Sequence, residues 1–554
     1  METYDNISAI IDIFNDADIE YVFFNPGIDN VPLLETLAEY RASGKKSPRG
    51  ILSLDEFVTM TAAHGNYMAT GRPQAVSIHS ELGTLQVGGS LHNAQWGKVP
   101  VIFFTEIQGP PERSNWKGEK FDQGIMVRNF VKWDHQMTDG EDIREVFQKA
   151  IGIATTEPYG PVYLAVPREM LWHRGEPIEK LPASTNYPSP VPKADESQLE
   201  KAVEILATAE NPLIVTGNAG RNLETPPLLL ELAETLGAQV QTSDIRVNFP
   251  TTHPLTAYAS PTGGFGNPII QNADVILAID YDMHYAASPL GPRPDAKIIH
   301  IDIDTAKKGR PLWNRQPDIQ IKADSSQAIP LLTALLKSRL TGQNEARVKK
   351  LEEEHNQRQK EWRDLALSHS QQKPITAHWL AYCINEVIAE DTVVVNQTIS
   401  PSVIVQHLVN RTKPGSLLSC AGGCIGWAIG AALGVKLASP DKTVISLMGD
   451  GAFVYGCPEA SLWSANFYKA PYLSIIFNNQ GYGAIKGLFR EKHDVDNMGA
   501  DITSPPDYAK IAEACKAYGR TVENPDDVVP ALKEGLERVK AGQPAVLDIR
   551  LKPV

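Results

Sequence analysis

The sequence predicts an α/β fold of three domains, each built on a parallel sheet that is flanked by helices. Short apolar runs end in glycine, proline or polar residues, as buried parallel strands do, and helical segments separate these runs. The alternation recurs in three stretches of similar length, which a proline-rich segment and a charged segment divide. The length of 554 residues suggests three or four domains of about 150 residues each.

The first domain is expected at residues 1–182, and a linker follows it. Its expected strands are Tyr21–Gly27, Gln74–Ser80, Val99–Glu106 and Gly160–Pro167, and its expected helices are Ile7–Asp18, Pro32–Tyr40 and Glu56–Tyr67. The segment Leu181–Lys193 contains four prolines among polar neighbours, so we interpret it as the linker.

Two further domains are expected at residues 194–340 and 372–554. Their expected strands are Pro212–Gly217, Val275–Asp280 and Lys297–Asp304 in the middle domain, and Thr392–Asn396, Thr443–Gly449, Leu473–Asn479 and Ala545–Leu551 in the last. The strongly charged segment after Leu340 is expected to form a solvated helix between these domains. The glycine pattern in Thr216–Asn222 is too weak to predict a dinucleotide site, so we interpret the middle domain as a vestigial nucleotide-type fold.

Composition and charge narrow the class of protein. The net charge of −14 and the pI near 5.5 disfavour a nucleic-acid binder, which is expected to be basic. Five cysteines without a Cys-x-x-Cys pair favour a reducing compartment. The first residues include acids, unlike a signal peptide, and no apolar run reaches the roughly 20 residues that span a bilayer. We therefore expect a cytoplasmic protein with no nucleic-acid or membrane partner.

Polar turns follow two neighbouring strands of the third domain. Gly449-Asp450-Gly451 ends one strand, and Asn478-Asn479 ends the next. The carboxyl ends of parallel strands share one edge of a sheet, where open α/β sheets bind ligands. Glycines let the backbone approach a phosphate, while Asp and Asn supply oxygen ligands for a hard cation. Gly-Asp-Gly alone also occurs in ordinary turns, but the pair of turns predicts a site for a magnesium ion and a diphosphate.

With these motifs the chain resembles the thiamine diphosphate (ThDP)-dependent enzymes. The resemblance covers nearly the whole length and is best in CAGGCIGWAIGAALGVKLASPDKTVISLMGDG and in FNNQGYGAIKGLF. Within the family it is greatest to benzoylformate decarboxylase, and more distant to acetolactate synthase and oxalyl-CoA decarboxylase. The resemblance implies that Asp450, Asn479 and the carbonyl oxygen of Gly481 bind Mg²⁺ or Ca²⁺. It also implies diphosphate contacts from Gly449, Gly451, Ala452 and Tyr482.

A carboxylate far away in the sequence supports this resemblance. ThDP needs such a group beside its aminopyrimidine ring, to sustain the imino form of the ring. In LSLDEFVTMTAAHGNYMATGRP, the residue that matches the family glutamate is Glu56. The adjacent Asp55 is the alternative carboxylate, and a single glutamate taken by itself is more often a solvated or helix-capping residue.

Three further positions match cofactor contacts of the family. In GGCIG (Gly422–Gly426), the resemblance assigns Ile425 to hold the cofactor in a bent shape. The carbonyl oxygen of Gly423 would accept a hydrogen bond from the aminopyrimidine. Thr398, which follows the strand TVVVN, would approach the diphosphate.

The substrate side of the site is expected at the ends of two strands of the first domain. The loop NPGIDN, with Asn25, Pro26 and Gly27, should line the pocket and contact the cofactor. Ile28 stands where benzoylformate decarboxylase has a serine that contacts the substrate carboxylate, which argues against benzoylformate itself as the substrate. His79 matches a proton-transferring histidine of that enzyme, and an imidazole suits this role near neutral pH.

Two matches are less specific. His284, in DYDMHYAAS, lies near the place from which the middle domain would supply a second catalytic histidine. Phe121, Asp122 and Gln123 belong to the charged insertion Gly109–Met137, and family members have a loop here that reaches the entrance of the site. The alternative for this segment is the beginning of a helix.

The resemblance implies ThDP- and Mg²⁺-dependent, non-oxidative decarboxylation of a 2-oxo acid to an aldehyde. One alternative is an acetolactate synthase-like carboligase, which joins the acyl unit to a second carbonyl compound. Another is a non-catalytic ThDP-binding protein. Because family members build the site between subunits, we expect a homodimer or a dimer of dimers. Glu56 would then act on ThDP that Asp450 and Asn479 of another subunit hold.

Overall fold

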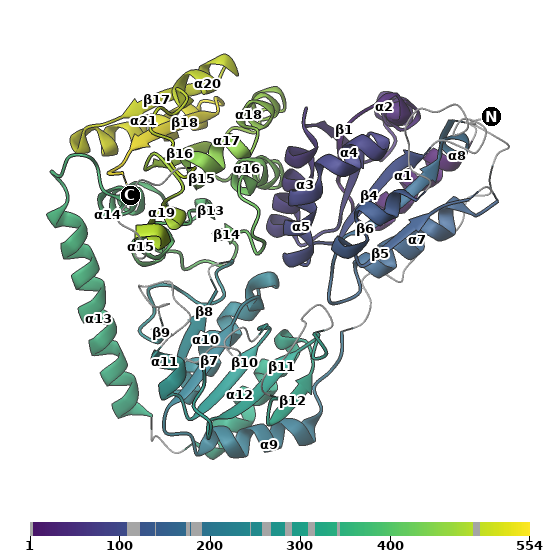
Figure 1. Ribbon diagram of the computed structural model, residues 1–554. Coiled ribbons are helices and arrows are strands. Elements are labelled where there is room, and N and C mark those ends of the chain that lie inside the picture. The colour runs from purple at the N-terminus through teal and green to yellow at the C-terminus, as the bar shows by residue number, and fades with distance from the viewer. Residues whose placement is uncertain are drawn as a thin grey trace.

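The computed structural model describes residues 4–107, 122–138, 140–172, 178, 191–243, 245–257, 268–282, 291–307, 316–340, 344–490 and 499–553. Within them lie three six-stranded sheets whose strand pairs all run parallel, which confirms the predicted three-domain α/β fold class. The three domains form a triangle, with the middle domain below the other two (Figure 1). The proposed limits of the domains at residues 182, 194, 340 and 372 stay predictions.

The first sheet has the strand order β2-β1-β3-β4-β6-β5. Its elements are α1 (Asn6–Asp16), β1 (Tyr21–Asn25), η1 (Ile28–Asn30), α2 (Val31–Ser43), β2 (Arg49–Leu52), α3 (Glu56–Thr70), β3 (Gln74–Ile78), α4 (Ser80–Gln86), α5 (Gly88–Trp96), β4 (Val101–Ile107), η2 (Gln123–Met126), η3 (Arg128–Phe130), β5 (Trp133–Gln136), α7 (Ile143–Ala154), β6 (Val162–Pro167) and α8 (Arg168–Trp172). The direction of chain progression reverses between β1 and β3, so their carboxyl ends form a crevice suited to a ligand.

The middle sheet has the order β12-β11-β10-β7-β8-β9, which reverses between β7 and β10. Its elements are α9 (Glu196–Ala207), β7 (Pro212–Thr216), η4 (Ala219–Arg221), α10 (Thr225–Leu236), β8 (Gln239–Thr242), β9 (Thr256–Ala257), α11 (Pro268–Asn272), β10 (Val275–Ile279), β11 (Lys297–Asp302), β12 (Ile319–Lys322) and α12 (Ser325–Arg339). The charged segment after Leu340 forms the long helix α13 (Glu345–Ser368), which runs between the middle and last domains as predicted (Figure 1).

The last sheet has the order β14-β13-β15-β16-β18-β17, which reverses between β13 and β15. Its elements are α14 (Ala377–Val387), β13 (Val393–Gln397), α15 (Ser402–Leu408), β14 (Leu417–Ser419), α16 (Trp427–Ala438), β15 (Val444–Gly449), α17 (Asp450–Tyr455), α18 (Pro458–Phe467), β16 (Leu473–Asn478), α19 (Gly483–Arg490), α20 (Tyr508–Ala514), β17 (Tyr518–Val522), η6 (Pro525–Asp527), α21 (Val528–Lys540) and β18 (Ala545–Arg550). The turns after β15 and β16 therefore lie beside one another, as the sequence predicts.

The structure adds seven strands that the sequence patterns do not indicate. They are β2, β5, β8, β9, β12, β14 and β17, and six of these are the edge strands of the three sheets. An edge strand has a neighbour on one side only, and here it also lacks the apolar run of a central strand. All four residues of β5 are half-buried, whereas all seven residues of β4 are buried.

The first and last domains meet along two helices, α3 and α16, which carry glycines at their contact (Figure 1). A Cβ atom built on Gly65 would lie 2.2 Å from the carbonyl oxygen of Ala431, and one on Gly434 would lie 1.9 Å from that of Ala62. The two backbones are thus in direct contact. A Cβ atom on Gly426 would lie 2.9 Å from the ring of Tyr455, and that ring lies 5.6 Å from the ring of Phe57. The Gly422–Gly426 turn therefore lies near the start of α3, where Glu56 is.

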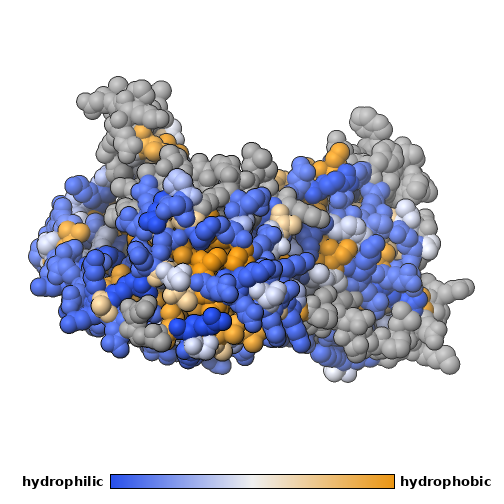
Figure 2. All heavy atoms as spheres, turned by 90° about the horizontal axis from the view of Figure 1, so that it is seen from below, coloured by the Kyte–Doolittle hydropathy of each residue, from blue (hydrophilic) through white to orange (hydrophobic). Residues whose placement is uncertain are grey.

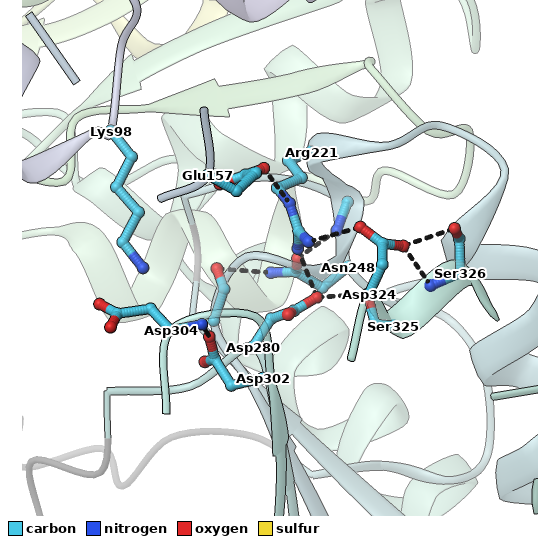
Figure 3. A network of polar contacts seen from close by, with 12 residues as sticks. Lys98, Glu157, Arg221, Asn248, Asp280, Asp302, Asp304, Asp324, Ser325 and Ser326 are labelled. Carbon is cyan, nitrogen blue, oxygen red and sulfur yellow. Dashed lines mark hydrogen bonds and ion pairs between the residues drawn. The ribbon is translucent and has the colours of Figure 1, made fainter. Parts of the chain in front are cut away.

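The carboxyl edge of the middle sheet holds an ion-pair network (Figure 3). The guanidinium of Arg221 lies 2.5 Å from Asp280 and 3.1 Å from Asp324. It also lies 3.2 Å from Glu157 of the first domain. Because the side chain of Arg221 is only 10% exposed, these pairs are shielded from solvent and tie the first two domains together.

Charged and polar residues cover most of the molecular face seen from below the view of Figure 1, with apolar residues in smaller patches between them (Figure 2). Among the helices that the structure describes, none is long and apolar enough to cross a membrane.

Candidate active site

Asp450 lies at the first position of α17, directly after β15. Its side chain accepts hydrogen bonds from the backbone amides of Gly451 at 2.8 Å and Gly481 at 3.0 Å. The residue is only 2% exposed, and burial raises the pKa of its carboxyl above the ordinary value, while these amide hydrogen bonds oppose the shift. The structure thus brings the Gly-Asp-Gly turn and Gly481 together.

The two asparagines after β16 have different surroundings. Asn478 is fully buried, and its side chain donates to Asp548 at 2.7 Å and accepts from the Gln480 amide at 3.2 Å. Asn479 precedes Gln480 and Gly481, and among the described residues its side-chain amide makes no hydrogen bond, while its backbone N–H donates to Phe477 at 3.2 Å. Asn479 is therefore free to bind a metal ion, whereas Asn478 stabilises the sheet edge.

The donor set at this turn fits a divalent cation. A buried carboxylate needs a compensating positive charge, and within the described ranges no lysine or arginine forms an ion pair with Asp450. The side-chain oxygen of Asn479 and the carbonyl of Gly481 would add oxygen donors of the kind that Mg²⁺ and Ca²⁺ prefer, and their role as ligands stays a prediction. Lys486 lies close by, but it pairs with Asp501 at 2.5 Å.

The surroundings of the turn also suit a diphosphate. A Cβ atom on Gly449 would meet nothing within 4 Å, so the backbone here faces open space. One on Gly451 would lie 2.7 Å from the ring of Tyr482, which therefore packs directly over this glycine. Ala452 follows within the first turn of α17, where backbone amides point toward the N-terminus of the helix.

Two residues of other elements fix the Gly422–Gly426 turn. Asn93, on α5 of the first domain, donates to the carbonyl oxygen of Cys424 at 2.8 Å and accepts from its amide at 3.0 Å. Gln397, at the end of β13, donates to the same carbonyl at 3.0 Å and accepts from the Ala428 amide. The sequence did not single out Asn93, because an asparagine inside a helix gives no local signal of a partner 331 residues away.

The Gly422–Gly426 turn contains two of the predicted cofactor contacts, Gly423 and Ile425. Gly423 is exposed, and nothing lies within 4 Å of a Cβ atom built on it. Ile425 is half-buried and packs against the core that the first and last domains share. Thr398 is buried, and its hydroxyl donates to Asn396 at 2.9 Å, so this side chain stabilises the strand end. The roles of Gly423, Ile425 and Thr398 toward a cofactor stay predictions.

Glu56 is the first residue of α3. The alternative carboxylate, Asp55, is the N-cap of this helix and accepts from the Val58 amide at 3.0 Å, so capping already occupies it. Glu56 is half-buried and makes no hydrogen bond or ion pair with any residue in the described part of the chain. Next to it, the rings of Phe57 and Tyr455 lie 5.6 Å apart, which brings the start of α3 to the end of α17.

The contact between Phe57 and Tyr455 lies within one chain. The two halves of the predicted site, Glu56 and the Asp450 turn, therefore flank one interdomain contact of the same molecule. That Glu56 acts on the cofactor of a partner subunit stays a prediction.

The substrate-side residues meet at the crevice between β1 and β3. His79 is the N-cap of α4, and a Cβ atom on Gly27 would lie 2.2 Å from its Nδ1 atom, so the predicted Asn25-Pro26-Gly27 loop and His79 are adjacent. Nδ1 of His79 lies 2.7 Å from the carboxylate of Asp29, which the sequence did not single out. Ile28 is 72% exposed.

Other predicted positions have different outcomes. His284 and Phe121 lie outside the described residues. Gln123 does not reach the entrance of the site: it is fully buried in η2, where its side-chain oxygen accepts from Tyr163 at 3.0 Å and from Thr105 at 3.2 Å. The alternative of a helix start is borne out in part, because Asp122 is the N-cap of the short 3₁₀ helix η2, although η2 and η3 then lead into β5 and not into an α-helix. Asp122 is exposed and pairs with Arg128 at 3.0 Å.

The three parallel α/β sheets and the turns after β15 and β16 suit a protein that binds a diphosphate cofactor. Family models of the thiamine pyrophosphate enzymes match in three places: the N-terminal TPP binding domain at residues 7–127, the central domain at 199–332 and the C-terminal TPP binding domain at 400–549. The chain belongs to this ThDP-dependent family, as the resemblance of the motifs predicted.

Individual relatives carry two different activities in their names. Benzoylformate decarboxylase of Pseudomonas aeruginosa is 27% identical, with 98% of each chain covered. The acetolactate synthase isozyme 3 large subunit of Escherichia coli is 25% identical over 99% of this chain and 95% of its own length. The crystal structure of benzoylformate decarboxylase from Polynucleobacter necessarius superposes with a TM-score of 0.82 over the full length of both chains at 20% identity, which shows the shared fold.

Proposed function

We propose that this protein catalyses the non-oxidative decarboxylation of a 2-oxo acid to an aldehyde, with ThDP and Mg²⁺ (or Ca²⁺) as cofactors. The observation that carries this proposal is the half-exposed His79 at the crevice between β1 and β3 of a ThDP-family chain. Decarboxylation requires a proton donor at the carbon atom that loses CO2, and histidine is the side chain best suited to that transfer near neutral pH.

Residues of the last domain would hold the cofactor. Asp450, Asn479 and the carbonyl of Gly481 would bind the metal ion, and the open backbone at Gly449 would approach the diphosphate. Bound ThDP supplies the nucleophilic carbon and the electron sink of the reaction. The free carboxylate of Glu56 would exchange a proton with the aminopyrimidine ring, a role that Asp55 cannot fill while it caps α3.

The reaction breaks the bond between C1 and C2 of the 2-oxo acid. C1 leaves as CO2, and C2 gains one proton, so that the product is the aldehyde with one carbon fewer. His79 would deliver this proton through Nε2, since its Nδ1 side faces Asp29. No oxidant is required.

The substrate is expected to carry an apolar group near its 2-oxo carbon. Ile28, which is exposed at the mouth of the crevice, offers an aliphatic surface there. An aliphatic side chain makes no hydrogen bond to a carboxylate, so we expect the 2-oxo acid to bind differently from benzoylformate in its decarboxylase.

The second candidate is a carboligase, which the similarity to acetolactate synthase supports. The holoenzyme should be incubated with a panel of aliphatic and aromatic 2-oxo acids, with and without an acceptor aldehyde, and both CO2 and new C–C products should be measured. Release of CO2 and aldehyde from a single substrate supports the decarboxylase. Dependence of turnover on the acceptor supports the carboligase, and absence of turnover with every acid indicates a non-catalytic ThDP-binding protein.

Replacement Glu56→Gln provides the internal control. It should abolish turnover while ThDP still binds, because binding depends on the last domain. Unchanged turnover in this variant would refute the role of Glu56.

We also propose a homodimer or a dimer of dimers in the cytoplasm, which gel filtration with light scattering and cell fractionation would test.

A further inference from the structure

Asp29 and His79 form a pair that joins the two strands at the crevice of the first sheet. Asp29 lies in η1 after β1, and His79 follows β3. One carboxylate oxygen of Asp29 lies 2.7 Å from Nδ1 of His79, and the other accepts from the backbone amide of Ser80 at 3.0 Å. Both oxygens are thus used, and they hold the histidine and the residue after it.

Exposure differs strongly between the two side chains. The side chain of Asp29 is 2% exposed, whereas that of His79 is 41% exposed. The carboxylate is therefore fixed within the protein, while part of the imidazole ring reaches the surface of the crevice. Since an ionised carboxylate can only accept, Nδ1 must carry the hydrogen atom, and Nε2 is left as the proton-exchanging atom.

The neighbouring residues are arranged around this pair. A Cβ atom on Gly27 would lie 2.2 Å from Nδ1 of His79 and 2.3 Å from the Asp29 carboxylate, so only glycine leaves room for their contact. The amide of Gly27 donates to Asn30 at 2.9 Å, and Asn30 donates to Ser77 on β3 at 2.7 Å. These bonds clamp the loop after β1 to β3.

Glu106, another carboxylate near Asp29, has partners of its own. It lies on β4, next to β3, and pairs with Arg168 and with the indole N–H of Trp172 at 2.8 Å. Asp29, and not Glu106, is therefore the carboxylate in contact with His79.

We propose that Asp29 is the positioning residue of the proton donor: it fixes His79 as the Nδ1–H tautomer, points Nε2 into the crevice, and stabilises the imidazolium that forms when Nε2 takes up a proton. This role rests on the proposed decarboxylation, in which His79 delivers a proton to the former C2 of the substrate. Comparable carboxylates orient histidines in other enzymes, and their loss lowers kcat more than it weakens substrate binding.

The test is the variant Asp29→Asn in the holoenzyme, studied by ¹⁵N NMR with labelled histidine and a His79→Gln sample for assignment. The Ser80 amide needs an oxygen acceptor, so the side-chain nitrogen of the asparagine would face Nδ1 of His79. That nitrogen can only donate, which forces the ring into the Nε2–H tautomer. The expected result is this change of tautomer. Relative to the wild type, kcat should be at least about tenfold lower, and KM should stay within about threefold of the wild-type value.

The matched control is Glu141→Gln, since Glu141 pairs with His135 at 2.8 Å in the same domain. It should alter the His135 signals and leave those of His79 and kcat unchanged. A wild-type His79 in the Nε2–H form, or unchanged His79 signals and kcat in Asp29→Asn, would overturn the proposal. The wild-type measurement needs no folded variant. If no 2-oxo acid is turned over but the tautomer still changes, the proposed function fails while the pairing stands.

Discussion

Replacing Gly434 by alanine would add a methyl group where α3 and α16 touch backbone to backbone. The new Cβ would lie 1.9 Å from the carbonyl oxygen of Ala62 and 2.9 Å from the amide nitrogen of Asn66. Ordinary contact begins at 3.4 Å, so the helices must separate by about 1.5 Å, the difference between the two distances. Backbone atoms cannot rotate away as a flexible side chain could.

Two effects should follow from this separation. Overpacking of this kind destabilises a protein by about 1–3 kcal/mol. The shift also moves Glu56, at the start of α3, away from the turn before α16, and a misplacement of about 1 Å can lower the rate about 100-fold. We therefore expect a lower urea midpoint and a kcat reduced by one to two orders of magnitude, with ThDP affinity, measured by calorimetry, weakened as well.

The matched control is Gly487→Ala on α19, where a Cβ atom would meet nothing within 4 Å. Alanine favours a helix over glycine by up to about 1 kcal/mol, so this variant should be as stable as the wild type or slightly more stable. If Gly434→Ala matched this control in stability and in kcat, the close contact between α3 and α16 would be refuted.

Three further substitutions, each at a buried titratable or charged residue, test how these groups affect stability at different pH. Burial and the nearby Arg246 lower the pKa of His64 to about 3, so the free energy of unfolding should fall as the pH drops below 6.5. Between pH 7 and pH 5 this residue should account for about 2 kcal/mol of the decrease. In His64→Gln, urea unfolding should show a decrease that is smaller by that amount. Arg221→Met leaves buried carboxylates unpaired and should cost about 3–5 kcal/mol at pH 8. The loss should shrink in acid, where Asp280, whose pKa burial raises, is protonated first. Burial raises the pKa of Glu106 to about 7, so stability should decline as pH rises from 4.5 to 7, and Glu106→Gln should lack this decline. If a variant and the wild type showed the same dependence of unfolding free energy on pH, the role given to that residue would be contradicted.

All central strands of the three sheets except β8 were predictable because burial on both faces produces apolar runs such as those of β4 and β16, whereas β8 has only one buried residue in four. Edge strands were not, since half-exposed residues such as those of β5 follow no apolar pattern. The Gly-Asp-Gly and Asn-Asn turns were predictable for a different reason. They follow central strands directly, so the parallel topology alone brings them together.

The missed residues of the site act through partners far away in the sequence. Asn93 fixes the turn at Cys424 from another domain, and Asp29 reaches His79 over 50 positions. Neither has a local pattern that distinguishes it from an ordinary polar residue. Gln123 shows the opposite error, because a polar residue in a charged insertion looks exposed until its hydrogen bonds to Tyr163 and Thr105 are known.

Calorimetric titration of the metal-supplemented protein with ThDP tests the proposed cofactor site most directly. The wild type should bind ThDP, and Glu56→Gln should bind it comparably, whereas Asp450→Ala should lose the affinity because it removes the buried carboxylate that the metal ion would share with Asn479. No affinity in the wild type, or equal affinity in Asp450→Ala, would contradict the site.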